Sequence, residues 1–231
     1  MICEAELLSE SLNNGEKAAA ISIHKSHVLY QLGRVDEGVQ EGKKAVALAT
    51  RTGQQRLVIG ANALLGMAYF FRGDLQQTIE TTLPDVDELR SRYRHALFET
   101  TATSSVNWLG DLAGMHAVAG QFDAAIGYAE EACAISEETQ KPFDKAMASG
   151  WFGYVLAAAG RPDEAIEQLE PALALATSHQ LAFLLPWFGA HLGLPTLWRA
   201  TLSAAARCSC TPDRVRTPLG SRSSEFGALS I

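Results

Sequence analysis

The sequence predicts an all-α fold, a superhelix of helical hairpins stacked side by side. The first reason is composition, because the 231 residues include 36 alanines, whereas valine and isoleucine together number 19. Alanine loses no side-chain entropy in a helix, while β-branched residues favour strands. The second reason is a short segment that recurs at intervals of 40 to 47 residues, a spacing typical of stacked helical hairpins. A strand-rich fold is therefore excluded.

The recurring segment has the residues of a tight turn between two helices. In each copy a glycine ends one helix, where a left-handed backbone is needed, and an acidic residue follows near the start of the next helix. The copies are LGRVDEGV from Leu32, RGDLQQTI from Arg72, AGQFDAAI from Ala119 and AGRPDEAI from Ala159. Their glycines are Gly33, Gly73, Gly120 and Gly160, at intervals of 40, 47 and 40 residues.

These turns divide the chain into hairpins. We predict hairpins at about residues 16–52, 56–90, 103–138 and 143–178, with an incomplete fifth at 181–194. A separate helix from Cys3 to Leu12 precedes them, and the charged stretch from Asp85 to His95 accounts for the longer second interval. Residues 1–194 therefore form one predicted repeat domain.

Small residues recur seven positions before each turn glycine. They are Ser26, Gly66, Ala113 and Gly153. Further alanines, such as Ala125, Ala129 and Ala132, recur at spacings that place them on one face of the second helix. Small faces let helices approach closely, and the larger apolar residues around them fill the space between hairpins. We interpret these residues as core and not as a cofactor site.

The pattern resembles the tetratricopeptide repeat. Gly153, Leu156, Gly160 and Ala165 form the clearest copy, and Gly66, Tyr69, Gly73 and, more loosely, Thr78 form another. The resemblance covers about residues 1–194 and implies a right-handed superhelix of tetratricopeptide-like hairpins. The intervals exceed the usual 34 residues, which indicates longer helices or linkers.

The wider order of segments resembles the C-terminal repeat region of bacterial signalling proteins that carry an adenylate or guanylate cyclase domain and an ATPase module. The segments that carry it are EAELLSESLNNGEKAAA, the insertion from LPDVDELRSRYRHALFETT onward, GYAEEACAISEETQ and LAFLLPWFGAHLGL. The resemblance implies a regulatory or scaffold segment that binds a protein, a peptide or an upstream cyclase or ATPase module. The alternative is the sensory arm of an ATP-dependent transcriptional activator. Upstream and downstream coding sequence distinguishes the two.

Composition and motifs argue against several other functions. The formal net charge of −7 disfavours contact with nucleic acid or an anionic membrane. The longest uncharged run, Leu181 to Trp198, contains two prolines and is not expected to span a membrane. No phosphate-binding loop or nucleophile motif occurs, so we expect no catalysis and no cofactor. The first ten residues do not resemble a secretion signal, and we expect a cytoplasmic protein.

Histidines and cysteines do not form a convincing metal site in the sequence. His24 and His27 share a helix face, but two ligands do not complete a site. Cys208 and Cys210 form a C-x-C pair without a second pair. His116 replaces the usual aromatic residue of the repeat, and we expect a half-buried packing residue there.

The remaining candidate for function is a surface. In stacked hairpins the first helices line the concave side, so residues beside their small positions are candidate partner contacts. These residues are His27, Tyr30, Met67, Phe70, Phe71, Asn107, Tyr154 and Trp187. Aromatic side chains make good binding anchors, although the same residues also dominate cores. The groove lacks the dense lysines and arginines that would capture a terminal carboxylate.

The repeat pattern stops after Leu194, and we predict an irregular tail over residues 195–231. Periodicity expects an aromatic residue at position 196 and a glycine at position 200, but the chain has Thr196 and Ala200. With permitted codons, one added nucleotide after the Leu194 codon restores both, so a frameshifted tail is one explanation. A native disordered extension rich in serine, proline and arginine is the other.

Overall fold

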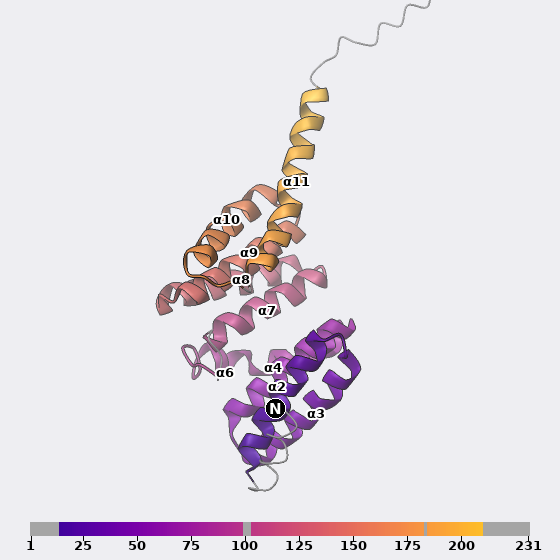
Figure 1. The fold of residues 1–231 in the computed structure, drawn as a ribbon, viewed down its shortest axis with the longest axis vertical. Coiled ribbons are helices and arrows are strands. Elements are labelled where there is room, and N and C mark those ends of the chain that lie inside the picture. Colours follow the sequence, from indigo (N-terminus) through magenta and orange to yellow (C-terminus); the bar gives the residue numbers. More distant parts are fainter. Residues whose placement is uncertain (1–13, 99–102, 183, 210–231) are drawn as a thin grey trace, which may run out of the picture.

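The computed structural model describes residues 14–98, 103–182 and 184–209. They form helices joined by short turns, with no strand among these residues, so the predicted all-α class is confirmed (Figure 1). The predicted helix from Cys3 to Leu12 lies outside the described residues. The helices are α2 (Gly15–Gln31), α3 (Val35–Thr52), α4 (Gln55–Arg72), α5 (Leu75–Thr82), α6 (Val86–Arg90), α7 (Ser104–Val118), α8 (Phe122–Thr139), α9 (Pro142–Ala158), α10 (Pro162–Ser178) and α11 (Leu185–Ser209), and the 3-10 helix η1 (Leu83–Asp85) precedes α6.

The four repeated turns share one backbone geometry. Each turn glycine has a positive φ, between 74° and 89°. The residue after each glycine donates its amide hydrogen to a carbonyl five residues back, as in Gln121 to His116 at 2.9 Å and Arg161 to Leu156 at 2.9 Å. Only glycine adopts this backbone without strain, and the added bond satisfies a carbonyl at the end of the helix. The recurring sequence segment therefore specifies the turn directly.

The small residues lie where the two helices of a hairpin approach closely. Any Cβ placed on Gly66 would collide with Thr82 of α5, and one placed on Gly153 would collide with Leu169 of α10. In the first hairpin the Ser26 hydroxyl, fully buried, donates to the carbonyl of Gly38 at 2.8 Å. The small positions are therefore contacts between helices, as the sequence indicates.

The first helices of successive hairpins also contact each other closely at glycine residues. Trp151 of α9 lies against Gly110 and Gly114 of α7, where a Cβ on either glycine would meet the indole ring. One layer further, Phe188 of α11 packs on Gly150 of α9. Each large ring occupies the space that a missing side chain leaves, so the layers stack at short distance.

The second hairpin departs from the regular pattern. Its second arm is split into α5, η1 and α6, with Pro84 in the first turn of η1. Buried Asp85 accepts a hydrogen bond from the Asn62 amide at 2.8 Å. The end of α6 and the segment after it are tied to α8, because Arg90 bonds Glu131 and Arg94 bonds Glu138 through paired hydrogen bonds. The insertion is therefore folded against the third hairpin.

His116 is buried, with 6% of its surface exposed, and not half-buried as the sequence suggested. The reason is α8, whose Tyr128 ring lies 5.2 Å from the imidazole, while Nδ1 lies 2.6 Å from Oε1 of Gln121. The prediction of a packing residue rested on the repeat alone, which does not show how fully α8 covers that position.

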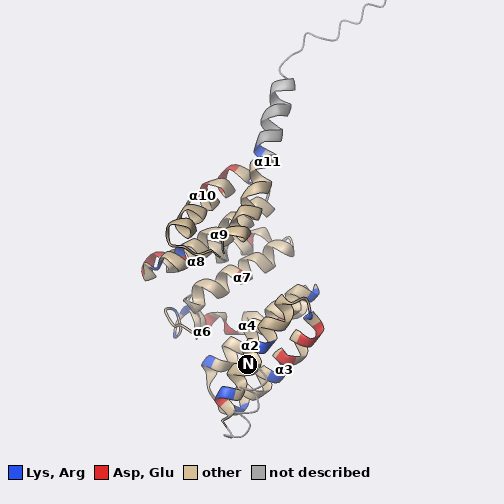
Figure 2. Ribbon diagram, in the orientation of Figure 1, with Lys and Arg blue, Asp and Glu red and all other residues tan. Residues whose placement is uncertain are grey.

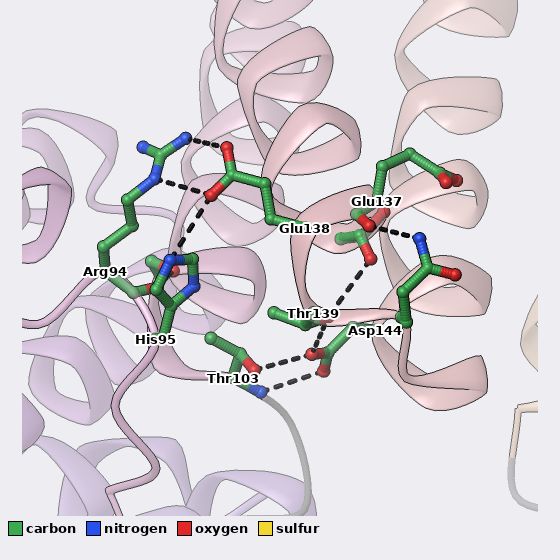
Figure 3. Close-up of polar contacts among 10 residues, drawn as sticks. Arg94, His95, Thr103, Glu137, Glu138, Thr139 and Asp144 are labelled. Atoms are coloured by element: carbon green, nitrogen blue, oxygen red, sulfur yellow. Dashed lines mark hydrogen bonds and ion pairs between the residues drawn. The ribbon is translucent and has the colours of Figure 1, made fainter.

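Buried Asp144 joins three helix ends (Figure 3). Its carboxylate accepts hydrogen bonds from the amide and hydroxyl of Thr103, at 2.9 and 2.6 Å, and from the hydroxyl of Thr139 at 2.9 Å. Thr103 is the N-cap of α7, Thr139 ends α8 and Asp144 lies in the first turn of α9. In the same view Arg94 and His95 converge on Glu138.

The C-terminal helix corrects the predicted irregular tail. Helix α11 does not end near Leu194 but runs through Pro195 to Ser209, and Figure 1 shows it projecting past α10. Residues 200–206 include four alanines, which favour helix, and the Thr196 hydroxyl bonds the Leu192 carbonyl at 2.6 Å beside the proline. Residues 210–231 lie outside the described part, so the two explanations of the tail stay predictions.

Gly153→Leu should destabilise the protein by about 2 kcal/mol, because the new side chain overpacks the contact with Leu169 and Ala165. Gly127→Leu is the matched control, since Gly127 lies inside α8 with open space around its Cβ position. Urea unfolding followed by circular dichroism measures both. Equal stability of the two variants would contradict the close contact.

Asp144→Ala should lower the free energy of unfolding by about 3 kcal/mol, because it leaves the buried amide and hydroxyl of Thr103 without their acceptor and removes one hydrogen bond of the Thr139 hydroxyl. Asp163→Ala removes an exposed carboxylate from the first turn of α10, and we expect a change within about 0.5 kcal/mol. Thermal and urea unfolding of the two variants measure both changes. If Asp144→Ala lowers the free energy of unfolding no more than Asp163→Ala does, the Asp144 hydrogen bonds do not hold the three helix ends together.

Candidate partner-binding groove

The eight predicted contact residues all lie on first helices of hairpins. His27 and Tyr30 are on α2, Met67, Phe70 and Phe71 on α4, Asn107 on α7, Tyr154 on α9 and Trp187 on α11. The structure brings most of them together in two aromatic groups, and Asn107 lies on the helix between these groups.

The first group, which we call the aromatic ladder, comprises His27, Tyr30, Phe70 and Phe71. The Tyr30 ring stacks on His27 at 5.2 Å and on Phe71 at 5.1 Å, and Phe70 meets Phe71 edge-on at 5.9 Å. Tyr30 is buried, and burial raises the pKa of its hydroxyl. Phe71 is 53% exposed, a large fraction for a phenylalanine that already stacks on a neighbour. The ladder therefore has a packed base and an open end.

The second group, the aromatic cluster, comprises Trp151, Tyr154, Trp187 and His191. The Trp151 ring contacts Tyr154 at 5.8 Å and Trp187 at 4.8 Å, and His191 contacts Tyr154 and Trp187, each at 4.7 Å. All four side chains are half-buried. Burial lowers the pKa of the His191 imidazole, which favours its neutral form.

Sequence reasoning named Tyr154 and Trp187 but missed Trp151 and His191. The sequence did contain one indication of Trp151. Gly110 and Gly114 lie four residues apart on α7 and so share one helix face, and a face without side chains leaves room for a large ring from another helix. His191 follows Trp187 by four residues, which places the two rings on the same helix face.

Between the two aromatic groups lies a polar pair on α7. The Asn107 amide donates to the Asp111 carboxylate at 3.3 Å. Burial raises the pKa of Asp111 to about 7. Asp111 lines a narrow cleft with Met67 of α4 and Thr82 of α5, and it was not among the predicted residues, although it is the one acidic residue in the sequence of α7.

A wider cleft opens beside this pair, where α2, α4 and α7 meet. Its volume is about 140 Å³, and it is lined by Ile23, His27, Leu64, Asn107 and Trp108, among others. The walls are mainly apolar, with histidine and amide groups at the edge. This cleft connects the predicted residues His27 and Asn107, which belong to different hairpins.

The charged residues gather mainly on the second helices. Figure 2 shows acidic segments on α3 and α10, where Asp36, Glu37 and Glu41 and then Asp163, Glu164, Glu167 and Glu170 lie. In contrast, α7 carries Asp111 alone among Asp, Glu, Lys and Arg.

The histidine pair of α2 does not come together with other ligand types. His24 is exposed, and Nε2 of His27 lies 2.7 Å from the Gln31 amide nitrogen. Within residues 14–98, 103–182 and 184–209, no three His, Cys, Asp or Glu side chains gather closely enough to hold a metal ion. The side chains of Cys208 and Cys210 lie outside the described part.

Comparison with known proteins bears on the fold. Residues 106–139, which include most of α7 and all of α8, match a family model of the tetratricopeptide repeat. No curated protein sequence matches the chain. Among the described residues, no helix has both the length and the apolar character needed to cross a bilayer.

Solved structures similar to this chain are also built from such repeats. Nearly identical TPR-like repeats described as kinesin light chain, from Podosopora anserina, are 20% identical, with a TM-score of 0.57, over 86% of this chain and 99% of that one. BtubC (BKLC) from P. vanneervenii is 16% identical, with a TM-score of 0.61, over 99% of this chain and 94% of that one. At such low identity the likeness shows the fold alone, and it confirms the predicted superhelix of tetratricopeptide-like hairpins.

Asp111→Asn should change the pH dependence of stability. Since the folded pKa of Asp111, about 7, lies above the unfolded value of 3.8, folding is weakened as pH rises from 4 to 7 and the carboxyl ionises. The variant cannot ionise at this position. The difference in free energy of unfolding, variant minus parent, should therefore rise by on the order of 2 kcal/mol between pH 5 and pH 8. Urea unfolding at both pH values measures this, and a pH-independent difference would contradict the raised pKa.

Proposed function

We propose that this tetratricopeptide-like superhelix is a protein-interaction module, and that its groove of first helices binds an extended segment of a partner protein. The supporting observation is the position of the aromatic ladder and the aromatic cluster on successive first helices, with the cleft of about 140 Å³ beside α7. Tetratricopeptide repeats suggest such a module in general.

The physical chemistry of the groove favours this role. Half-buried aromatic rings offer large apolar area at little cost in rotamer entropy, which makes them effective anchors. Phe71 leaves about half of its surface exposed, 53%, and so has area left to bury against a partner. A bound segment must give up its own conformational freedom, so we expect modest affinity.

In this proposal the chain has a regulatory or scaffold role and no catalytic one. Its sequence contains no phosphate-binding loop and no nucleophile motif, and its fold is typically non-catalytic. The net charge of −7 supports a protein partner over nucleic acid or an anionic membrane. The cytoplasmic location belongs to the same proposal.

An origin in a bacterial cyclase or ATPase signalling protein draws no support from the comparisons, and neither does the sensory arm of a transcriptional activator. Both stay predictions from the sequence resemblance. An upstream cyclase or ATPase reading frame would support the first, and an adjoining helix-turn-helix the second.

Phe71→Ala and Trp187→Ala should each weaken binding of selected peptides about tenfold or more, because each removes an aromatic anchor of the groove. The peptides come from a random dodecapeptide phage library panned on the full chain, and fluorescence anisotropy measures their Kd. Phe122→Ala is the matched control, an aromatic residue 37% exposed on the second helix α8.

Circular dichroism establishes that each variant keeps its fold. The proposal fails if no peptide is selected, or if Phe122→Ala weakens binding while the two groove variants bind normally.

A further inference from the structure

The carboxylate of Asp111 lies beside the groove residues Asn107, which lines the wider cleft, and Tyr30 of the aromatic ladder. It shares a hydrogen bond with Asn107 and lines the cleft with Met67 and Thr82. None of the ion pairs among the described residues includes it. A carboxylate removed from water is costly unless a positive charge or several hydrogen-bond donors compensate it.

The elements around Asp111 supply no such charge. Helix α2 presents the Tyr30 phenol and the His27 ring, and burial lowers the pKa of this histidine, which favours its neutral form. Helix α4 contributes Met67, and α5 contributes Thr82. Of the nearby arginines, Arg72 pairs with Asp74 and with Asp36, and Arg90 pairs with Glu131.

The other packed helices complete the surroundings. From α9, Trp151 lies on Gly110 and Gly114, the residues just before and three after Asp111. Helix α8 covers another side of α7, where His116 contacts Tyr128. Asp111 therefore has Tyr30 of the aromatic ladder near it and Trp151 of the aromatic cluster beside the same turn of α7, and no ion pair within residues 14–98, 103–182 and 184–209 reaches it.

We propose that the groove selects partner segments by a lysine or arginine side chain, whose cation pairs with the Asp111 carboxylate between the aromatic ladder and Trp151. This inference rests on the proposed function and names the chemistry of the partner. Aromatic faces attract a cation through the ring quadrupole, and their apolar surface suits the methylene stem of a basic side chain. Asp111 is the one charged residue of α7, and its neighbours in the cleft are mainly apolar, so one basic residue flanked by apolar ones fits the groove best.

A peptide is favoured over other cations for geometric reasons. A metal ion would need further ligands beside Asp111, and the described residues hold no group of three. The two aromatic groups lie on different hairpins, so one ligand that reaches both must be extended, as a peptide segment is.

Protonation is linked to this binding. A free carboxyl with a pKa of about 7 is partly protonated at neutral pH, and a bound cation stabilises only its ionised form. Binding should therefore release a proton near pH 7 and strengthen as pH rises from 6 to 8.

The test uses the phage library described above, panned on the full chain and, separately, on Asp111→Asn. Peptides selected by the parent should carry a lysine or arginine at one fixed position, and replacing that residue with citrulline or norleucine should weaken binding about tenfold. Peptides selected by Asp111→Asn should keep the apolar positions and lose the basic preference.

Two further measurements address the pairing itself. The affinity of a selected basic peptide should rise from pH 6 to pH 8 for the parent, and this rise should be smaller for Asp111→Asn, whose remaining dependence reports His27 and His191. In a ¹³C NMR titration, the Asp111 carboxyl should titrate near pH 7 in the free chain and well below that in the complex.

Each outcome distinguishes this inference from the proposed function. Selected peptides that bind through the aromatic anchors but show no basic preference would overturn the inference and leave the interaction module standing. An Asp111 that already titrates below pH 5 in the free chain would mean that water or a cation within the chain already compensates the carboxylate, which also overturns the inference. A library that yields no binding peptide contradicts both.

Discussion

Close helix contacts at residues without bulky side chains determine how this superhelix is built. Within hairpins, the side chains of Thr82 and Leu169 pack directly against Gly66 and Gly153, where a Cβ would collide with them. Between hairpins, the indole ring of Trp151 packs against Gly110 and Gly114, where α7 has no side chains in the way. Because protein interiors are packed to crystal-like density, each missing Cβ sets the distance of the neighbouring helix. The order of layers and the position of the groove both depend on these contacts.

Polar groups fix where the helices end, which the apolar contacts cannot do. The turn glycines allow the amide that follows them to close each first helix with the same hydrogen bond. At the junction between the third and fourth hairpins, Asp144 in the first turn of α9 accepts hydrogen bonds from Thr103 at the start of α7 and from Thr139 at the end of α8. Paired bonds from Arg90 and Arg94 hold the insertion to α8. Apolar packing thus sets the spacing, and these bonds set the ends.

The groove combines two properties that ordinary cores do not share. Its aromatic rings contact one another across hairpins, yet Phe71 stays more than half exposed. Beside these rings, α7 carries Asp111, a carboxyl whose pKa burial raises to about 7, while most charges lie on the second helices. In the proposed role, the apolar area of this surface would drive association with a partner segment, and the acidic group would discriminate between segments.

The sequence by itself determined the helical class, the repeated turns and the small contact positions, because these follow from local rules: glycine for a left-handed turn, alanine for helix, and a fixed spacing along one face. It also predicted groove residues such as Tyr154, which the structure places in the aromatic cluster and whose role in binding stays a prediction. The tertiary structure alone decided that Trp151 covers the glycines of α7, that His116 is enclosed by α8, and that Asp111, half-buried, takes part in none of the ion pairs among the described residues. Those properties depend on residues about 40 positions away or on neighbouring layers, and helix periodicity carries no information about which side chains from other helices meet there.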